Sequence, residues 1–401
     1  MNVAQRLPGA FAGRRPMTLL ITAAMFADAV FYALIAPLLP HYSEQLSLDH
    51  LQVGLLVGAH PAGTVACAAI AARLVRGRGA AITITLGLIS LGLATIVFGV
   101  ANSLPLLAAC RFVQGASAAM VWCGGLARLQ AIAPPERQGA ALGLAGSAAG
   151  AGSLFGPALA ALSVVISIQA LLLTLGALTL LLAATLYSAG ELPGERRFEE
   201  PGGRPSRSLA QAAAEMARPV GVIVACGAVL GATATLAPLR LADLGAGLVL
   251  IAAAFALSAL GEIFASPFAG HISDQVGRMP PMRLSLVLAI PLLAIQGATD
   301  SAWLMIVAVA LTGAVIASLW PLATALLADE SSRWEGSAAG VFATSVVAFS
   351  SGLAAGSVLC GALAGSAGEG AAYSALVLVC VISLASLMGA KPLPRYKSRL
   401  S

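Results

Sequence analysis

The chain has 401 residues, of which 59% are hydrophobic and 10% charged, whereas soluble domains carry about 25% charged residues. This composition excludes an ordinary soluble domain and indicates a polytopic membrane protein, in which small residues let helices approach closely. The net charge of +5 does not indicate nucleic-acid binding, because the positions of the basic residues explain it. No GxxxxGK[ST], HExxH or GxSxG motif occurs, which argues against direct ATP driving and against an enzyme.

The six cysteines all lie inside apolar runs, and none forms a CxxC pair. We interpret them as small core residues and expect no disulfide, no metal site and no cofactor. The first apolar run is too long for the hydrophobic region of a signal peptide, so the first helix is expected to be retained.

Twelve apolar runs are long enough to cross a bilayer. A helix rises about 1.5 Å per residue, so about 20 residues cross a hydrocarbon layer of about 30 Å. The sequence therefore predicts an all-α membrane protein with twelve transmembrane helices. The runs lie near residues 17–40, 52–74, 80–101, 104–127, 138–162, 165–188, 219–240, 247–271, 281–299, 302–327, 337–363 and 371–390.

The basic residues indicate the topology. With the N-terminus in the cytoplasm, 20 of the 22 lysines and arginines fall in cytoplasmic segments, and the exceptions are Arg111, inside the fourth run, and Arg240, at an outer end. Cytoplasmic loops of membrane proteins carry this excess. We therefore expect both termini in the cytoplasm, and the location to be a bacterial inner membrane.

One long connection, residues 189–218, divides the chain into two halves of six runs. It is charged and rich in proline and glycine, which is typical of a flexible linker, and its end at 209–218 could form a short surface helix. The predicted organisation is a cytoplasmic tail (1–16), a six-helix bundle (17–188), the linker (189–218), a second six-helix bundle (219–390) and a C-terminal tail (391–401).

The two halves repeat short patterns. The tripeptide Ala-Pro-Leu at 36–38 recurs at 237–239, and the pair Gly115 and Trp122 recurs as Gly313 and Trp320. PPERQGAALG after the fourth run is echoed by SSRWEGSAAG after the tenth. These matches indicate an internal duplication and two pseudo-symmetric bundles, an architecture in which transporters hold a site between the repeats.

Asp28 lies in the middle of the first apolar run, MTLLITAAMFADAVFYALIAPLLP. A charge at this depth costs at least about 2.5 kcal/mol, so the residue is expected to face the bundle interior or a watery cavity and to have a function. The alternative is a protonated carboxyl that only hydrogen-bonds a neighbouring helix. Tyr32 follows one turn later on the same face.

Arg111 and Glu262 are further ionisable residues at membrane depth. Arg111 begins a stripe on the fourth helix that includes Gln114, Gly115, Ala118 and Trp122, and its permanent charge should turn the stripe inward. One carboxyl group in each half and one fixed positive charge suit proton coupling, because a proton and a cationic substrate can compete for the same carboxylate. A static pair between Arg111 and one acid is the alternative.

Other residues are candidates for lining a binding cavity, although membrane tryptophan and phenylalanine also serve packing. For His60, which precedes Pro61, a hydrogen-bonded imidazole at a helix kink competes with a role as a proton relay. The cavity candidates are Tyr32, Phe31, Gln114, Trp122, Trp320, Gln296 and His60.

Four patches resemble the major facilitator superfamily and its proton-coupled drug antiporter branch. The sequence PLLP at 37–40 follows Asp28 in the first helix, and this helix also resembles the first helix of vesicular amine transporters. LAACRFVQGASAA at 107–119 is similar to the R-x-x-Q-G pattern, whose arginine the family implicates in proton transfer. Gly143, Gly152, Gly156 and Pro157 reproduce the antiporter pattern G-x(8)-G-x(3)-G-P, in which close packing and a proline kink suit a hinge.

The fourth patch, GHISDQVGRMPPMR at 270–283, is similar to the cytoplasmic G-x-x-x-D-x-x-G-R loop motif. The resemblance implies that Asp274 and Arg278 latch helix ends together in one conformation, and that Gly270 and Gly277 belong to the same conformational motif. The first-half copy departs from the motif, with Ala69 at its glycine and Arg73 at its acid.

The resemblance implies a transporter that works by alternating access and exports small amphipathic or cationic molecules in exchange for protons. Asp28, Glu262 and Arg111 would serve proton coupling. A dedicated exporter of a metallophore, sugar or amino-acid derivative, with Arg111 holding a substrate carboxylate, is the first alternative. A non-transporting sensor or scaffold is the second. Expected partners are the substrate, protons and lipid, with no nucleic acid, and the protein is expected to be a monomer.

Overall fold

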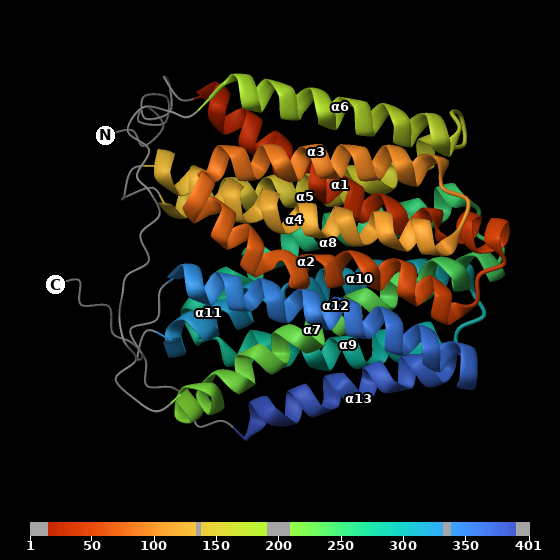
Figure 1. The fold of residues 1–401 in the computed structure, drawn as a ribbon. Helices are drawn as coiled ribbons and strands as arrows, with labels where there is room; N and C mark the ends of the chain where they lie inside the picture. The colour runs from red at the N-terminus through yellow and green to blue at the C-terminus, as the bar shows by residue number, and fades with distance from the viewer. Residues whose placement is uncertain (1–14, 134–137, 191–208, 332–337, 390–401) are drawn as a thin grey trace, which may run out of the picture. The chain divides into compact units, whose positions relative to one another are not determined.

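The computed structural model describes residues 15–133, 138–190, 209–331 and 338–389, and these ranges are almost entirely helical (Figure 1). Most of both predicted tails, and residues 191–208 of the predicted linker, lie outside the described residues. The helices are α1 (Arg15–Leu46), α2 (His50–Arg78), α3 (Ala80–Val100), α4 (Leu104–Ile132), α5 (Gln138–Leu162), α6 (Ile168–Ser188), α7 (Leu209–Asp243), α8 (Leu248–Val276), α9 (Met279–Ala298), α10 (Ala302–Ala317), α11 (Leu319–Ser331), α12 (Ala338–Ala367) and α13 (Glu369–Met388).

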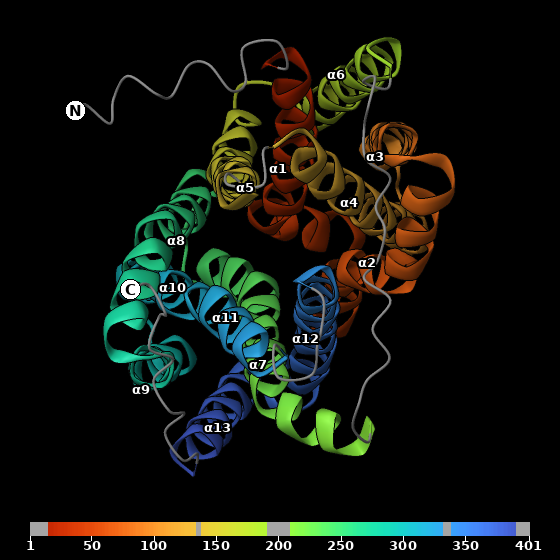
Figure 2. The same cartoon turned by 90° about the vertical axis from the view of Figure 1, so that its left-hand side faces the viewer.

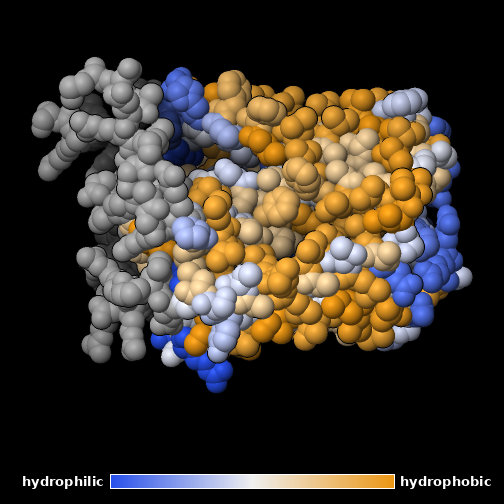
Figure 3. All heavy atoms as spheres, turned by 90° about the horizontal axis from the view of Figure 1, so that it is seen from above, coloured by the Kyte–Doolittle hydropathy of each residue, from blue (hydrophilic) through white to orange (hydrophobic). Residues whose placement is uncertain are grey.

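Twelve stretches of the described chain are long and apolar enough to cross a membrane, which confirms the predicted all-α membrane fold. Large hydrophobic side chains lie exposed along the helices, as on the orange face in Figure 3. In water this exposure would be unfavourable, whereas lipid tails are as apolar as these side chains. The chain is a multi-pass membrane protein.

The described residues divide into two compact units. Unit 1 lies within Met1–Leu48, Leu55–Glu200 and Gly247–Ala256, and unit 2 within Asp49–Gly54, Pro201–Ala246 and Leu257–Ser401.

The two units use the same helix pairings. In unit 1, α1 packs against α4 and α5, and α3 packs against α4 and α6, as the view along the helices shows (Figure 2). In unit 2, α7 packs against α10 and α12, and α9 packs against α10 and α13. The order of the partners along the chain is the same in both units, so these five spans of each half repeat one arrangement.

Glycines permit the closest of these pairings at matching positions. A Cβ atom on Gly156 of α5 would lie 2.7 Å from the Cβ of Ala33 on α1, and Gly152 meets α1 one turn away. In unit 2, Gly352 and Gly356 of α12 meet the backbone of α7. Each pair of glycines is separated by 200 residues (352 − 152 and 356 − 156). The second half therefore retains these two glycines, which are not among the repeated patterns noted above, and Ser357 stands at the position that corresponds to Pro157.

The predicted tenth span, 302–327, is not one continuous helix. It is interrupted at Ser318 between α10 and α11. Pro321 has no N–H to donate to the carbonyl of Ala317 four residues earlier, and its ring crowds that carbonyl. Neighbouring carbonyls find side-chain donors: the Ser318 hydroxyl donates to Val315 at 2.7 Å, and the Cys226 thiol of α7 donates to Ile316 at 3.1 Å.

The seventh helix is longer than the predicted run at 219–240. It begins at Leu209 and continues through Arg218, so the suggested short surface helix is the first part of α7.

An arginine binds the C-terminal end of the sixth span of each half. In unit 1, Arg128 of α4 donates to the carbonyl of Gly190, just beyond α6, at 2.6 Å. In unit 2, Arg283 of α9 donates to the carbonyl of Leu387 in α13, also at 2.6 Å. Unsatisfied carbonyls make a helix C-terminus partly negative, so each guanidinium stabilises the end that it binds.

We expect Gly156→Ala to destabilise the protein, because its Cβ would lie 2.7 Å from Ala33 Cβ and 2.8 Å from the Val30 carbonyl oxygen. Overpacking of this kind costs about 1–3 kcal/mol, so the thermal unfolding midpoint of the purified protein should fall by several degrees. Gly143→Ala is the matched control, since no atom lies within 4 Å of its Cβ position. Equal midpoints for the two variants would contradict the proposed close packing.

Candidate functional site

The ionisable residues predicted for the first half come together within unit 1. Asp28 and Tyr32 are on α1, His60 is on α2, and Arg111 and Trp122 are on α4. Asp28, His60 and Arg111 are buried, while Tyr32 and Trp122 are half-buried. The cluster lies in the core of the unit, inside helices that have the length of membrane spans.

Asp28 is held by a tryptophan. The indole Nε1 of Trp122 donates to Oδ2 of Asp28 at 2.8 Å, and the other carboxyl oxygen, Oδ1, is buried without a hydrogen-bond partner among the described residues. One half of the carboxyl group is therefore fixed by the protein. The other half has no group to bind, and this is uncommon for a buried oxygen.

Arg111 is 1% exposed and has few partners. Its Nη1 donates to the carbonyl of Phe31 at 3.3 Å and to Oε1 of Gln114 at 3.0 Å. Its Nε and Nη2 are buried and have no hydrogen-bond partner in the described chain. The guanidinium interacts electrostatically with Asp28 and Tyr32, but no ion pair within 4.0 Å joins Arg111 to Asp28. It is thus a buried cation with two nitrogens, and three N–H groups, available.

His60 lies where α2 and α4 cross. A Cβ atom on Gly115 would overlap the carbonyl oxygen of His60, and the Thr64 hydroxyl donates to the carbonyl of Gly115 at 3.1 Å. The His60 ring is tilted against Tyr32 with centroids 5.3 Å apart, and its Nε2 has no partner within the described ranges. The position has a structural role at the crossing, and its imidazole also faces the cluster.

Two glutamines that the sequence predicts to line a cavity form buried hydrogen bonds to threonines. Gln114 on α4 donates to Thr95 on α3 at 3.0 Å, and Gln296 on α9 donates to Thr312 on α10 at 2.7 Å. Because α3 corresponds to α9 and α4 to α10, the two units contain the same bond with the residue types exchanged. The sequence signal was present, since Gln114 and Thr312 are separated by the 198 residues that separate Gly115 from Gly313.

Unit 2 contains Glu262 on α8 and Trp320 at the start of α11. Glu262 is half-buried, and its charge acts on Cys226 of α7, the thiol that also binds the interrupted tenth span. The Trp320 ring lies against Phe349 with centroids 5.4 Å apart, and its Nε1 is buried without a partner among the described residues. Asp28 and Glu262 belong to different units, and each is described within its own.

The loop motif of the second half forms an ion network. Arg278 donates to Asp274 at 2.6 Å and to Asp329 on α11 at 3.2 Å, so it joins the end of α8 to α11. Partial burial of the guanidinium disfavours its charge, but the hydrogen bonds to the two carboxylates outweigh this and raise the pKa of Arg278. Gly277 has a φ of 94°, which a side chain would strain. Gly270 has open space around it, and Asp329 was not foreseen.

The cysteines are free thiols. Among the described residues, no group of three or more His, Cys, Asp and Glu side chains could hold a metal ion.

Comparison with known sequences finds one family. A sequence model described as Major Facilitator Superfamily matches residues 21–294 and 221–400. The MFS-type transporter ppzB of Metarhizium majus is 31% identical over 149 residues, which are 34% of this chain and 31% of that protein. The uncharacterized MFS-type transporter C18.02 of Schizosaccharomyces pombe is 30% identical over 132 residues, 31% of this chain and 29% of that protein. The match thus spans about a third of these relatives.

Solved structures share the fold. A bacterial homologue of the human lysosomal transporter Spinster, in an inward-facing and occupied conformation, gives a TM-score of 0.72 at 17% identity, covering 94% of this chain and 96% of that chain. The nucleoside transporter NupG, as a D323A mutant, gives 0.71 at 13% identity, covering 92% and 98%.

We expect Trp122→Phe to destabilise the protein by about 1–3 kcal/mol, because it leaves a buried carboxyl oxygen without its donor. The loss should shrink to less than half in an Asp28→Leu background, where no carboxyl remains. Thermal unfolding of the four proteins of this cycle measures the coupling. Trp303→Phe is the control, since Trp303 is 69% exposed. Equal losses in both backgrounds would show that Trp122 acts through packing alone.

Proposed function

The chain belongs to the major facilitator superfamily, and on this premise we propose that it is a proton-coupled secondary transporter that exports small amphipathic or cationic molecules by alternating access. That it is a transporter of this superfamily follows from the family. The coupling ion, the direction and the substrate class are our proposals.

The half-satisfied carboxyl group of Asp28 is the observation that supports coupling. Trp122 binds Oδ2, while Oδ1 is buried and has no partner among the described residues. A proton on Oδ1 neutralises the group, and an N–H donor or a cation of the substrate satisfies the ionised form. Because both use the same oxygen, binding of one favours release of the other. Exchange of substrate for protons follows from this competition.

Arg111 and Glu262 have separate roles in this proposal. The fixed charge of Arg111 favours the ionised form of Asp28, so substrate and proton remain close competitors. Glu262 places a second carboxyl group at membrane depth in unit 2, beside the interrupted span. Discontinuous helices are where transporters of several folds bind substrate or ions.

We propose Tyr32, His60, Trp122 and Trp320 as cavity residues. Trp122 binds Asp28, Tyr32 follows Asp28 by one helical turn, and the His60 ring packs against Tyr32. Trp320 lies at the interrupted span, and its Nε1 is buried without a partner among the described residues. Phe31 is 4% exposed, and the side chains of Gln114 and Gln296 are engaged with threonines. These observations support a packing role for Phe31, Gln114 and Gln296. A substrate that bound either glutamine would have to replace its threonine partner.

The unpartnered nitrogens of Arg111 favour a second candidate function, export of an anionic or zwitterionic metabolite. A carboxylate would accept from Nε and Nη2 in the bidentate geometry that arginine offers. In that case Asp28 would repel rather than attract the substrate.

We also propose that the protein lies in a bacterial inner membrane and that both of its termini face the cytoplasm. The arrangement of the basic residues supports this topology. Reaction of cysteines introduced into the two tails with an impermeant reagent, in intact cells and in inverted vesicles, tests it. Labelling of the tails in intact cells would show that the termini face outward, and this would contradict the proposed topology.

The function is tested by proton release from the purified protein in weak buffer as tetraphenylphosphonium, a lipophilic cation, is added. We expect release on binding, and in Asp28→Asn no release and an affinity at least about tenfold weaker, which corresponds to about 1.4 kcal/mol. Glu44→Gln, an exposed acid on the same helix, is the control. If Asp28→Asn behaved as the parent protein, Asp28 would not be the shared group. Binding of benzoate instead, lost in Arg111→Gln, would favour the metabolite exporter.

A further inference from the structure

One helix pair of unit 2, α11 and α12, contains three buried polar atoms without a hydrogen-bond partner among the described residues. They are the indole Nε1 of Trp320, the hydroxyl of Thr324 and the hydroxyl of Ser345. Trp320 and Thr324 are one helical turn apart on α11, so their side chains share a face of that helix. Ser345 is on α12, which packs against α11, and it is 0% exposed.

The aromatic rings of this helix pair bring the three polar atoms to one level. The Trp320 ring lies between Phe342 and Phe349 of α12, with centroids 6.3 and 5.4 Å away. The two phenylalanines flank Ser345 on one helix face, three residues before it and four after it. Successive spans run antiparallel, so one turn forward from Trp320 on α11 and one turn back from Phe349 on α12 lead to Thr324 and Ser345. The indole and both hydroxyls therefore lie where the two helices face each other.

The first half of the chain has apolar residues at the positions of these hydroxyls. Leu126 corresponds to Thr324 by the 198 residues that separate the two tryptophans (324 − 126), and Ala145 corresponds to Ser345 by the 200 that separate the glycine pairs (345 − 145). Ala145 belongs to the apolar core cluster of unit 1, and Leu126 packs against that cluster. The repeated arrangement thus packs without hydroxyls, and unit 2 has gained two that packing does not require.

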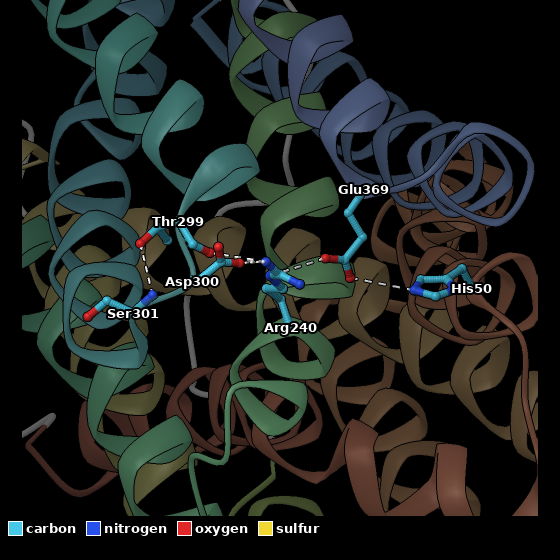
Figure 4. A network of polar contacts seen from close by, with 6 residues as sticks. All are labelled: His50, Arg240, Thr299, Asp300, Ser301 and Glu369. Atoms are coloured by element: carbon cyan, nitrogen blue, oxygen red, sulfur yellow. Dashed lines mark hydrogen bonds and ion pairs between the residues drawn. The ribbon is translucent and has the colours of Figure 1, made fainter.

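The charged groups at helix ends of unit 2 are paired. Arg240 binds Asp300 at 2.9 Å and lies 3.6 Å from Glu369, and the same carboxylate lies 3.5 Å from His50 Nε2 (Figure 4). A buried polar atom without a partner, in contrast, lowers the stability of the protein, because its bond to water is lost and not replaced. Three such atoms on one pair of facing helices indicate a partner from outside the chain.

The chemistry of the three groups defines this partner. An indole N–H can only donate, and each hydroxyl can donate one hydrogen bond, so an oxygen acceptor such as a carbonyl is their common complement. The rings of Trp320 and Phe349 offer flat apolar faces to a planar group. All three polar groups are neutral, and they would not compensate a charge for the loss of its water.

We propose that Trp320, Thr324 and Ser345, together with the ring of Phe349, form a subsite for a neutral planar group that carries an oxygen acceptor. The subsite deepens the proposed function, and it rests on that function only in taking the bound molecule to be the transported one. It would select substrates by the part of the molecule that carries no charge.

A matched pair of neutral ligands tests the subsite. The ligand 9-fluorenone has a carbonyl where fluorene, with the same three fused rings, has a methylene group. Binding of both to the full-length protein in lipid nanodiscs is measured by equilibrium dialysis, and empty nanodiscs correct for partition into lipid. We expect 9-fluorenone to bind about three- to tenfold more tightly than fluorene, the size of effect of a net hydrogen bond.

The variants Trp320→Phe, Thr324→Val and Ser345→Ala remove the polar atoms and keep most of the shape. Each should lower the ratio of the two affinities, and the triple variant should bring the ratio close to one. A ratio of one in the parent protein, or an unchanged ratio in the triple variant, would overturn the proposal.

Ser357→Ala is the matched control, since Ser357 is also on α12 and 0% exposed but donates to the carbonyl of Gly231 at 3.0 Å. It should keep the ligand ratio and lower the thermal unfolding midpoint. Thr324→Val and Ser345→Ala should leave the midpoint unchanged or raise it, because they remove hydroxyls without partners. If they lowered it as Ser357→Ala does, the hydroxyls would have partners in the empty protein and the proposal would fail.

The outcome is separate from that of the proton-release experiment, because both ligands are neutral and the ratio does not involve proton exchange. A ratio of three or more without proton release would support the subsite and contradict the coupling. Proton release with a ratio of one would contradict the subsite alone.

Discussion

Inside the hydrocarbon layer, backbone carbonyls and charged side chains have no water to bind, and the structure of both units follows from this constraint. Regular helices satisfy nearly all backbone groups. Near Pro321, where the helix is interrupted, the Ser318 hydroxyl and the Cys226 thiol donate hydrogen bonds to backbone carbonyls at the end of α10. Where α6 and α13 end, Arg128 and Arg283 bind carbonyls there. Asp28 and Arg111 are among the buried side chains that keep polar atoms without a partner in the described chain. They are also ionisable groups at membrane depth, and function is expected at such groups.

The same constraint explains why glycines lie where the helices pack most closely. Helices in lipid gain little from burying apolar side chains against each other, so close backbone contact and van der Waals packing hold them together. Gly152 and Gly156 provide this on α5, and Gly352 and Gly356 provide it on α12. The pair recurs in both halves, so the glycine spacing reflects the internal duplication. Gly143 and Pro157 are the parts of the α5 pattern that do not recur, since Ala343 and Ser357 stand at the corresponding positions.

The titratable groups occupy two kinds of environment. Asp28 and Arg111 lie deep in unit 1, where the partners that are missing define what can bind. His50, Arg240 and Glu369 lie at the ends of helices, where the Glu369 carboxylate faces both the imidazole and the guanidinium. A deep site can exchange a proton for a substrate, while a site at helix ends can only make a contact stronger or weaker.

The sequence by itself determined the span number, the topology expected from arginine positions, the duplication and the buried charges. Each of these depends on local composition or on spacing along the chain, for example Asp28 within an apolar run and Gly115 repeated at Gly313. Only the tertiary structure decided which groups meet. Trp122 binds Asp28, Gln296 binds Thr312, and Glu369 faces both His50 and Arg240, across separations that no helical period relates. Such pairs depend on which helices cross and at what depth, and packing in three dimensions sets both.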